Sequence, residues 1–206
     1  MISLFIDTSM SCVSISIVKD NVLVSSIQEN IPNEHSKYAT SYVKRVIDEA
    51  GIDANDVDNI LVVNGPGSFT GVRIGVTIAK TYGYLIDKEI IPVSSLKSLA
   101  ISSHKDGIVM SVIPANRSNY YIGIYDSEYN EIIDEKFVNV DELLEKINEY
   151  KPYIVSNDFN VVGKYKLNKV NLDILAIVDY YKNKKTVHYH ALVPNYLKLP
   201  QAMENK

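Results

Sequence analysis

The residues from Gly65 to Gly75 combine four glycines and a proline between a strand-like and a helix-like pattern. A glycine turn at a helix N-terminus can bind phosphate through backbone N–H groups. The spacing fits neither common fingerprint, because a dinucleotide loop needs GxGxxG and a P-loop needs GKS or GKT, whereas Gly71 is followed by valine. The alternative is a tight turn that lets a helix pack closely, and the spacing favours it. The residues of this structural loop are Gly65, Pro66, Gly67 and Thr70, with Thr70 as the helix cap.

Asp7-Thr8-Ser9 is a second candidate, with a carboxylate and two hydroxyls between two strand-like runs. Such side chains commonly bond their own backbone in turns, which is a purely structural role. The other interpretation is a loop for metal and phosphate, in which Asp7 would be a weak cofactor-binding candidate. Both interpretations stay open at this point.

The remaining reactive side chains do not form a recognisable site. The four histidines show no HxxxH spacing, and we expect His188 and His190 to lie solvated on one face of a strand. We therefore predict no metal site. The single cysteine, Cys12, cannot form an internal disulfide, and we expect it to be a small core residue in a reducing compartment. A peptidase would need a nucleophile with a base or a pair of metal ligands, and the sequence offers neither.

Composition limits the classes of partner. The chain has 206 residues, 46% of them hydrophobic, and a net charge of −4, so it gives no basic footprint for nucleic acid. If RNA is involved, we expect another subunit to hold it, so that contact with tRNA is only indirect. The N-terminus lacks a basic start, and no apolar run approaches the length of a membrane span. We therefore expect a cytoplasmic protein without a membrane partner.

The helix expected at residues 70–87 is apolar over too wide an arc for one neighbour. At 3.6 residues per turn its apolar residues cover about 200°, whereas packing on one sheet needs roughly 100°. We infer two packing partners for this helix. Gly71 and Gly75 fall near the middle of the arc, where a second helix or a sheet could approach closely. Arg73, Thr77, Lys80 and Tyr84 share the opposite, polar face.

Periodicity predicts an α/β chain in which one pattern occurs twice. In the first half, strands are expected at 2–6, 11–18, 22–27, 59–64 and 90–93, and helices at 33–50 (capped by Asn33, closed by Gly51), at 70–87 and from Ser94. Residues 105–107 are the expected domain boundary. In the second half, strands are expected at 108–113, 120–125, 132–138 and 153–155, and helices after Asn139 and around 174–181.

These motifs resemble the TsaB family of bacterial tRNA threonylcarbamoyladenosine biosynthesis proteins. The matching residues are 6–9, Glu34-His35-Ser36, 65–75, 93–96 and 194–198. The resemblance covers nearly the whole chain. It implies an actin-like ATPase (ASKHA, ribonuclease H-like) fold made of two βββαβα-type halves, the second reduced. The expected domains are 1–105, which carries the partner-binding helices, and 106–206, whose last segment packs back on the first.

The resemblance also implies which chemistry is missing. The catalytic relative TsaD carries two metal-binding histidines four residues apart on the helix that corresponds to 94–103, where this chain has Ser95 and Leu99. A second phosphate loop is not visible either, since the nearest candidate, residues 156–159, has no glycines. We expect no catalytic residue and no cofactor on this chain alone, with ATP and metal belonging to partner subunits. A nucleotide at a subunit boundary stays possible.

Two classes of function follow. The first is a non-catalytic scaffold that binds TsaD directly, and TsaE within the complex, for threonylcarbamoyl transfer to N6 of adenosine 37 of tRNA. Alone, the chain is expected to form a homodimer through helices 34–50 and 70–87. The partner-binding residues would be Tyr38, Gly71, Ile74, Gly75, Ile78 and Leu85. The second class is a stand-alone ATPase or small-molecule kinase that uses Asp7.

Overall fold

The computed structural model describes residues 1–31, 34–116, 118–157 and 161–197, and it divides into two compact units. The first unit consists of residues 1–95 with 173–194, and the second of residues 96–172 with the residues from 195 onward. The expected boundary at residues 105–107 differs from this division. Residues 173–194 return to the first unit because Val187 and Ile90 exchange two backbone hydrogen bonds of 2.8 and 2.9 Å.

The first unit is built on a five-stranded mixed sheet in the order β3-β2-β1-β4-β5. Its strands are β1 (Ile2–Asp7), β2 (Cys12–Lys19), β3 (Val22–Asn30), β4 (Asn59–Gly65) and β5 (Ile90–Ser94). The first three form an antiparallel meander, whereas β1, β4 and β5 run parallel. Both β1 and β4 are buried almost throughout, as expected for central strands covered on two faces.

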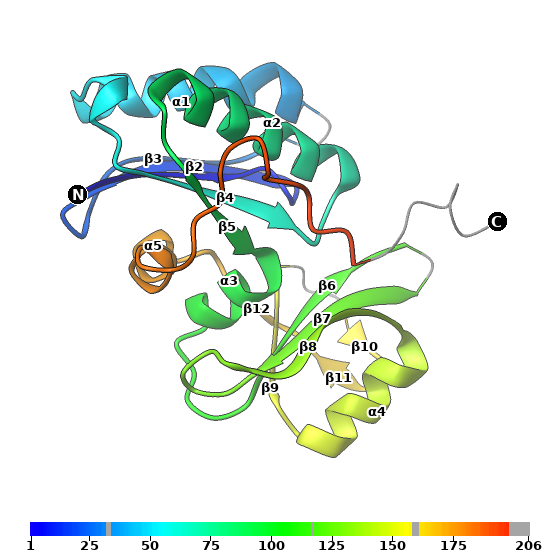
Figure 1. The fold of residues 1–206 in the computed structure, drawn as a ribbon. Coiled ribbons are helices and arrows are strands. Elements are labelled where there is room, and N and C mark those ends of the chain that lie inside the picture. Colours follow the sequence, from blue (N-terminus) through cyan, green and yellow to red (C-terminus); the bar gives the residue numbers. More distant parts are fainter. Residues whose placement is uncertain (32–33, 117, 158–160, 198–206) are drawn as a thin grey trace. The chain divides into compact units, whose positions relative to one another are not determined.

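Helices cover both faces of this sheet (Figure 1). On one face lie α1 (His35–Ala50), which contacts β2 and β3, and α2 (Phe69–Ile86), which contacts β4 and β1. On the other face, α5 (Ile174–Tyr181) contacts β1, β2 and β3. The short helix η1 (Ala54–Asp56) leads into β4. The core between the sheet and α1 and α2 is formed by aliphatic side chains such as Leu4, Ile6, Ile15, Val46 and Val76.

The helix ends correct part of the sequence interpretation. The cap of α2 is Ser68 and not Thr70, because the Ser68 hydroxyl accepts a 3.2 Å hydrogen bond from the Gly71 N–H and Thr70 already lies in the first turn. Asn33, the expected cap of α1, lies outside the described residues, and the residue before α1 is Glu34, whose side chain makes no capping bond. Gly51 closes α1 in the left-handed conformation, as predicted.

The second unit repeats the strand order of the first. Its sheet runs β12-β9-β6-β7-β8, with β6 (Val109–Pro114), β7 (Asn119–Tyr125), β8 (Glu131–Asn139), β9 (Tyr153–Ser156) and β12 (Asn168–Lys169). Its helices are α3 (Ser95–Ser102), which begins one residue later than expected, and α4 (Val140–Tyr150), which Asn139 caps as predicted. Between β9 and β12, where the first unit has α2 between β4 and β5, the described residues form only the hairpin β10 (Val161–Val162) and β11 (Tyr165–Lys166). In the described part of the chain, no helix is long and apolar enough to cross a membrane.

Candidate functional site

The turn after β1 holds a buried carboxylate. Asp7 is only 2% exposed, and its Oδ1 accepts a 2.7 Å hydrogen bond from the Ser9 N–H. Burial raises the pKa of Asp7 from 3.8 to about 6, although the Ser9 bonds and the charge of His35 act in the opposite direction. His35 itself lies beside the turn, with its Nε2 2.6 Å from the Met10 carbonyl oxygen. Asp7 is thus a carboxyl group that is partly protonated near pH 6.

The glycine-rich segment packs directly on this turn. The Ser68 N–H donates to the Ser9 carbonyl oxygen (2.8 Å), and the Thr8 hydroxyl donates to the Gly71 carbonyl oxygen (2.7 Å). A Cβ on Gly67 would lie 2.5 Å from the Ser9 carbonyl oxygen, so a side chain cannot be accommodated there without movement of the backbone. Gly65 has a φ of 123°, which glycine adopts far more readily than other residues.

Gly71 and Gly75 face the same turn. A Cβ on Gly71 would lie 2.1 Å from the Thr8 carbonyl oxygen, and one on Gly75 would lie 2.6 Å from the Thr8 hydroxyl oxygen. Both glycines are buried within the chain, so their missing side chains are explained by this internal contact, and their assignment as partner-binding residues stays a prediction. The interpretation as close packing agrees with this geometry.

The described residues bring no set of metal ligands together. No three His, Cys, Asp or Glu side chains of the described ranges cluster in a way that could hold a metal ion. Ser95, one of the two positions that the resemblance to TsaD singled out, is buried, and its hydroxyl lies 3.2 Å from that of Ser9. Leu99, at the other position, is buried as well. Of the possible second phosphate loop, residues 158 and 159 lie outside the described residues.

His188 and His190 differ in part from their prediction. Both are exposed, but they follow an isolated bridge at Val187 and neither lies in a strand; His190 lies in a turn. The Cys12 side chain is half-buried at the start of β2, where its Sγ lies 3.7 Å from the Val13 carbonyl oxygen.

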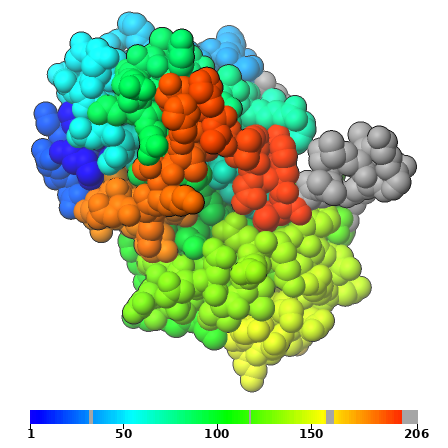
Figure 2. All heavy atoms as spheres, viewed as in Figure 1, coloured from blue at the N-terminus to red at the C-terminus, as the bar shows by residue number. Residues whose placement is uncertain are grey.

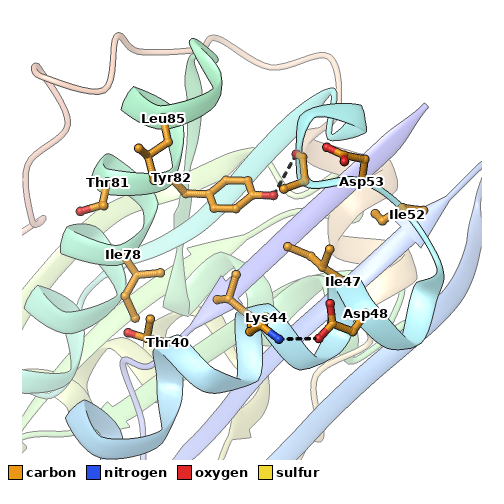
Figure 3. A pocket seen from close by; sticks show the side chains of 12 residues that line it. Thr40, Lys44, Ile47, Asp48, Ile52, Asp53, Ile78, Thr81, Tyr82 and Leu85 are labelled. Carbon is orange, nitrogen blue, oxygen red and sulfur yellow. Dashed lines mark hydrogen bonds and ion pairs between the residues drawn. The ribbon is translucent and has the colours of Figure 1, made fainter.

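The surface between α1 and α2 is hollowed into an apolar groove of about 530 Å³ (Figure 3). Its apolar lining consists of Val43, Ile47, Ile52, Ala54, Ile78, Tyr82 and Leu85. The Tyr82 hydroxyl is used within the chain, since it donates to the Ala54 carbonyl oxygen at 2.9 Å. Polar groups lie at the rim, among them the Lys44–Asp48 ion pair of 3.0 Å. Leu85 is 70% exposed, so its side chain offers most of its apolar area to solvent.

A second hollow of about 360 Å³ lies along the same helix pair. It is lined by Ser36, Phe69, Thr70, Arg73, Ile74 and Thr77, and the Arg73 guanidinium lies 3.8 Å from the centre of the Phe69 ring.

The two hollows contain three of the predicted partner-binding residues: Ile78 and Leu85 line the first, and Ile74 lines the second. Tyr38 lines neither hollow. Its ring stacks on that of Tyr42, with the ring centres 5.9 Å apart, and the Tyr42 hydroxyl donates to Glu29 of β3. The helix at 34–50 was expected at the interface, but its groove residues Val43 and Ile47 were not named, and the contribution of residues 52–54 was missed. In the sequence, Val43 and Ile47 carry the signal, since they lie at one edge of the apolar face of α1.

Comparisons with known proteins agree with the sequence motifs and the fold. A family profile described as TsaD, tRNA N6-adenosine threonylcarbamoyltransferase, matches residues 23–188. The chain belongs to this family. The tRNA threonylcarbamoyladenosine biosynthesis protein TsaB of Bacillus subtilis is 29% identical over 98% of this chain and 96% of its own. TsaB of Escherichia coli is 31% identical over 63% of this chain and 57% of its own.

A solved structure of YeaZ from Pseudomonas aeruginosa superposes with a TM-score of 0.77 at 23% identity, covering 95% of this chain and 99% of that one. Within the family, the chain is therefore a TsaB/YeaZ-like protein. The predicted α/β class, an actin-like fold made of two halves with the same strand order, is confirmed.

Proposed function

We propose that this protein is a non-catalytic scaffold subunit in the biosynthesis of threonylcarbamoyladenosine in tRNA. In this proposal it binds TsaD directly, and TsaE within the complex, and so supports threonylcarbamoyl transfer to N6 of adenosine 37 in the cytoplasm. ATP and metal belong to the partner subunits. Participation in threonylcarbamoyladenosine biosynthesis rests on the family match and on the names of the curated relatives. The scaffold role rests chiefly on the groove between α1 and α2.

The groove has the properties of a protein interface. It is apolar, its lining includes Val43 and Ile47, which are buried in the core, and its rim is polar. The ridges of a third helix can pack into the groove between two others, and contiguous exposed apolar surface commonly marks such an interface. Leu85 is the most exposed apolar side chain of the groove. In the absence of TsaD, the same face would pair with its copy in a homodimer.

Two features of the β1 turn support a non-catalytic role. The glycine segment packs closely on the carbonyl oxygens of Thr8 and Ser9, which agrees with a structural role for its glycines. By the resemblance to TsaD, Ser95 and Leu99 correspond to the two histidine ligands of that protein, and neither side chain can replace an imidazole.

The alternative, a stand-alone ATPase or kinase, would use Asp7 as an ionised carboxylate near a phosphate or a magnesium ion. Burial raises the pKa of Asp7 to about 6 because the charged form is poorly solvated there. The Ser9 N–H beside it is already bonded to Asp7 itself, and the Ser9 carbonyl oxygen to the Ser68 N–H of the glycine segment. Both observations favour the scaffold.

Co-purification decides between these functions. We expect untagged TsaD to be retained on a column by the tagged chain, and tRNA modification to require the chain, TsaD and TsaE together. The lone chain should hydrolyse no ATP. ATP turnover by the lone chain that disappears in Asp7→Ala would contradict the scaffold proposal and favour the enzyme.

The matching interface test uses Leu85. Ile74→Glu is less suitable, because Ile74 is partly buried against the core and a charge there also destabilises the fold. Leu85→Glu places the charge on a side chain that the fold leaves exposed, so a loss of TsaD binding reports on the interface itself.

A further inference from the structure

The first unit carries a second unusual surface, formed by the segment that follows α5. Residues 180–190 contain three lysines, two histidines and no acidic residue, in a chain whose net charge is −4. The backbone of this segment is fixed. Val187 is bonded to Ile90, and the Lys80 ammonium donates to the carbonyl oxygens of His190 (3.2 Å) and Leu192 (3.1 Å). Figure 2 shows this orange-to-red segment lying over the surface of the first unit.

Four rings form a cluster at this surface. Tyr84 of α2 is 62% exposed and lies edge-on to Tyr189, with the ring centres 5.8 Å apart. The His190 ring lies 6.3 Å from Tyr84 and 5.3 Å from His188. Both histidines are exposed. Exposed aromatic and imidazole rings that are held in place by a fixed backbone are suitable surfaces for stacking an unpaired nucleobase.

Cationic groups lie beside the rings. Lys184 and Lys185 are exposed, and neither forms an ion pair with another residue of the described ranges; the Lys184 ammonium lies 4.4 Å from the centre of the Tyr180 ring. Lys182 is already paired with Asp179 at 2.5 Å, so its charge is largely compensated.

The acidic neighbours keep the local charge moderate. Glu89 accepts a hydrogen bond from the Thr186 hydroxyl, and Asp87 ends α2. Lys88, Lys184 and Lys185 carry three positive charges, and Asp87 and Glu89 carry two negative ones. The local net charge is therefore +1 when the histidines are neutral. A surface of this kind suits a supplementary contact, not the main binding site of a long polyanion.

We propose that residues 184–190 and Tyr84, here called the 184–190 patch, contact RNA directly. Lys184 and Lys185 neutralise phosphates, while the rings of Tyr84 and His190 stack on an unpaired base. The identification of this RNA as the tRNA held by the complex rests on the proposed function. This proposal differs from the expectation, drawn from the net charge of −4, that the chain contacts tRNA only indirectly. A net charge describes the whole chain, so a negative value can hide a local excess of positive charge.

The test measures binding of a fluorescein-labelled, unmodified tRNA transcript to the complex with TsaD, by anisotropy at several salt concentrations. Lys184→Gln/Lys185→Gln should raise Kd about fivefold or more at low salt and reduce the slope of log K against log salt by about 1 to 2, since each lost phosphate contact removes about 0.7–0.9. Tyr84→Ala/His190→Ala should raise Kd by about fivefold or more with an unchanged slope, because stacking releases no counterions.

The matched control is Lys164→Gln/Lys166→Gln. Both lysines are exposed, and Lys164 lies over the Tyr165 ring at 5.4 Å, much as Lys184 lies over Tyr180. The control should bind RNA like the wild type. The proposal is overturned if the patch variants bind the transcript with the affinity and salt slope of the wild type and the control. It is equally overturned if they lose only binding to TsaD, because the patch would then serve a protein partner.

Assembly is measured first, by light scattering of every variant with TsaD. If the wild-type chain does not assemble with TsaD, the proposed function fails, and the same titrations are run on the lone chain. If the lone wild-type chain binds the transcript weakly and both patch variants bind it more weakly still, the result supports the 184–190 patch as an RNA contact. No binding, or equal binding by all variants, overturns it.

Discussion

The carbonyl oxygen of Thr8 lies 2.1 Å from the position that a Cβ on Gly71 would occupy. Real Cβ atoms do not come so near a backbone oxygen, so the first turn of α2 and the turn after β1 fit together only with glycine at this position. The contact joins β1 to the helix that forms one side of the groove. The position of the groove wall therefore depends on a glycine in the core.

Gly71→Val should destabilise the fold by roughly 1–3 kcal/mol, because the added side chain displaces the Thr8 backbone. For a chain of this size, each kcal/mol lowers Tm by about 2–4 °C. Thermal melts with and without ATP and magnesium provide the measurement, and the loss should appear without nucleotide. Thr70→Val, the same side chain one residue earlier at an exposed position, is the control and should melt like the wild type. Equal apo stabilities, with a nucleotide-dependent shift in the wild type alone, would show that Gly71 serves phosphate binding.

Ser68→Ala should cost about 0.5–2 kcal/mol in the free energy of unfolding, since it removes the hydroxyl that accepts from the Gly71 N–H. Thr70→Ala should cost clearly less, because Thr70 is exposed in the first turn of α2 and does not cap it. Urea unfolding of both variants measures the difference. If Thr70→Ala proved the more damaging of the two, the assignment of Ser68 as the cap would be wrong.

The sequence predicted the architecture well, because burial imposes a clear period on strands and helices. The antiparallel meander of the first unit and its two long helices were all expected from periodicity. Cap positions were harder to predict. Ser68 and Thr70 both have capping side chains, and only the backbone geometry decides which of them precedes the first helical residue.

The wide apolar arc of α2 was interpreted correctly only in part. It does have two neighbours, but the second is α1 of the same chain, so Gly71, Gly75 and much of the arc are used inside the fold. What stays exposed is a narrower surface that includes Leu85. Periodicity shows how much of a helix is apolar, but it does not show which neighbour covers it. Periodicity likewise assigned Lys80 to the polar face of this helix. In the structure its ammonium group donates to the carbonyl oxygens of His190 and Leu192, because residues 173–194 return to this unit.

Asp7 should make the protein less stable as pH rises from about 4 to 6. Its pKa is 3.8 when unfolded and about 6 when folded, so the folded state holds an extra proton in this window and loses its advantage as that proton leaves. At 1.36 kcal/mol per pKa unit, the total is roughly 3 kcal/mol. Asp7→Asn keeps an acceptor for the Ser9 N–H and removes the charge. It should therefore be more stable than the wild type at pH 7 and similar to it at pH 4.

Urea unfolding at several pH values measures this difference, which also includes the effect of the nearby His35 charge. Asp20→Asn provides a control of opposite sign. The hydrogen bond from the N-terminal ammonium lowers the pKa of Asp20 in the folded protein. The Asp20 carboxylate therefore stabilises the fold above its unfolded pKa, and this stabilisation is lost as pH falls. A wild-type curve parallel to that of Asp7→Asn between pH 4 and 7 would show that the Asp7 pKa is not raised.

Leu85→Glu should give a folded protein that neither forms a homodimer nor binds TsaD. The substitution places a charge on the exposed apolar wall of the groove, where it would have to be buried without a partner in either complex. The control is Leu175→Glu, on an exposed leucine of α5, on the opposite face of the sheet from the groove. Light scattering measures self-association, and retention of TsaD on the tagged chain measures the heterocomplex. If Leu85→Glu stayed dimeric and bound TsaD as strongly as Leu175→Glu does, the groove could not be the interface, and another surface of the chain would have to carry the scaffold role.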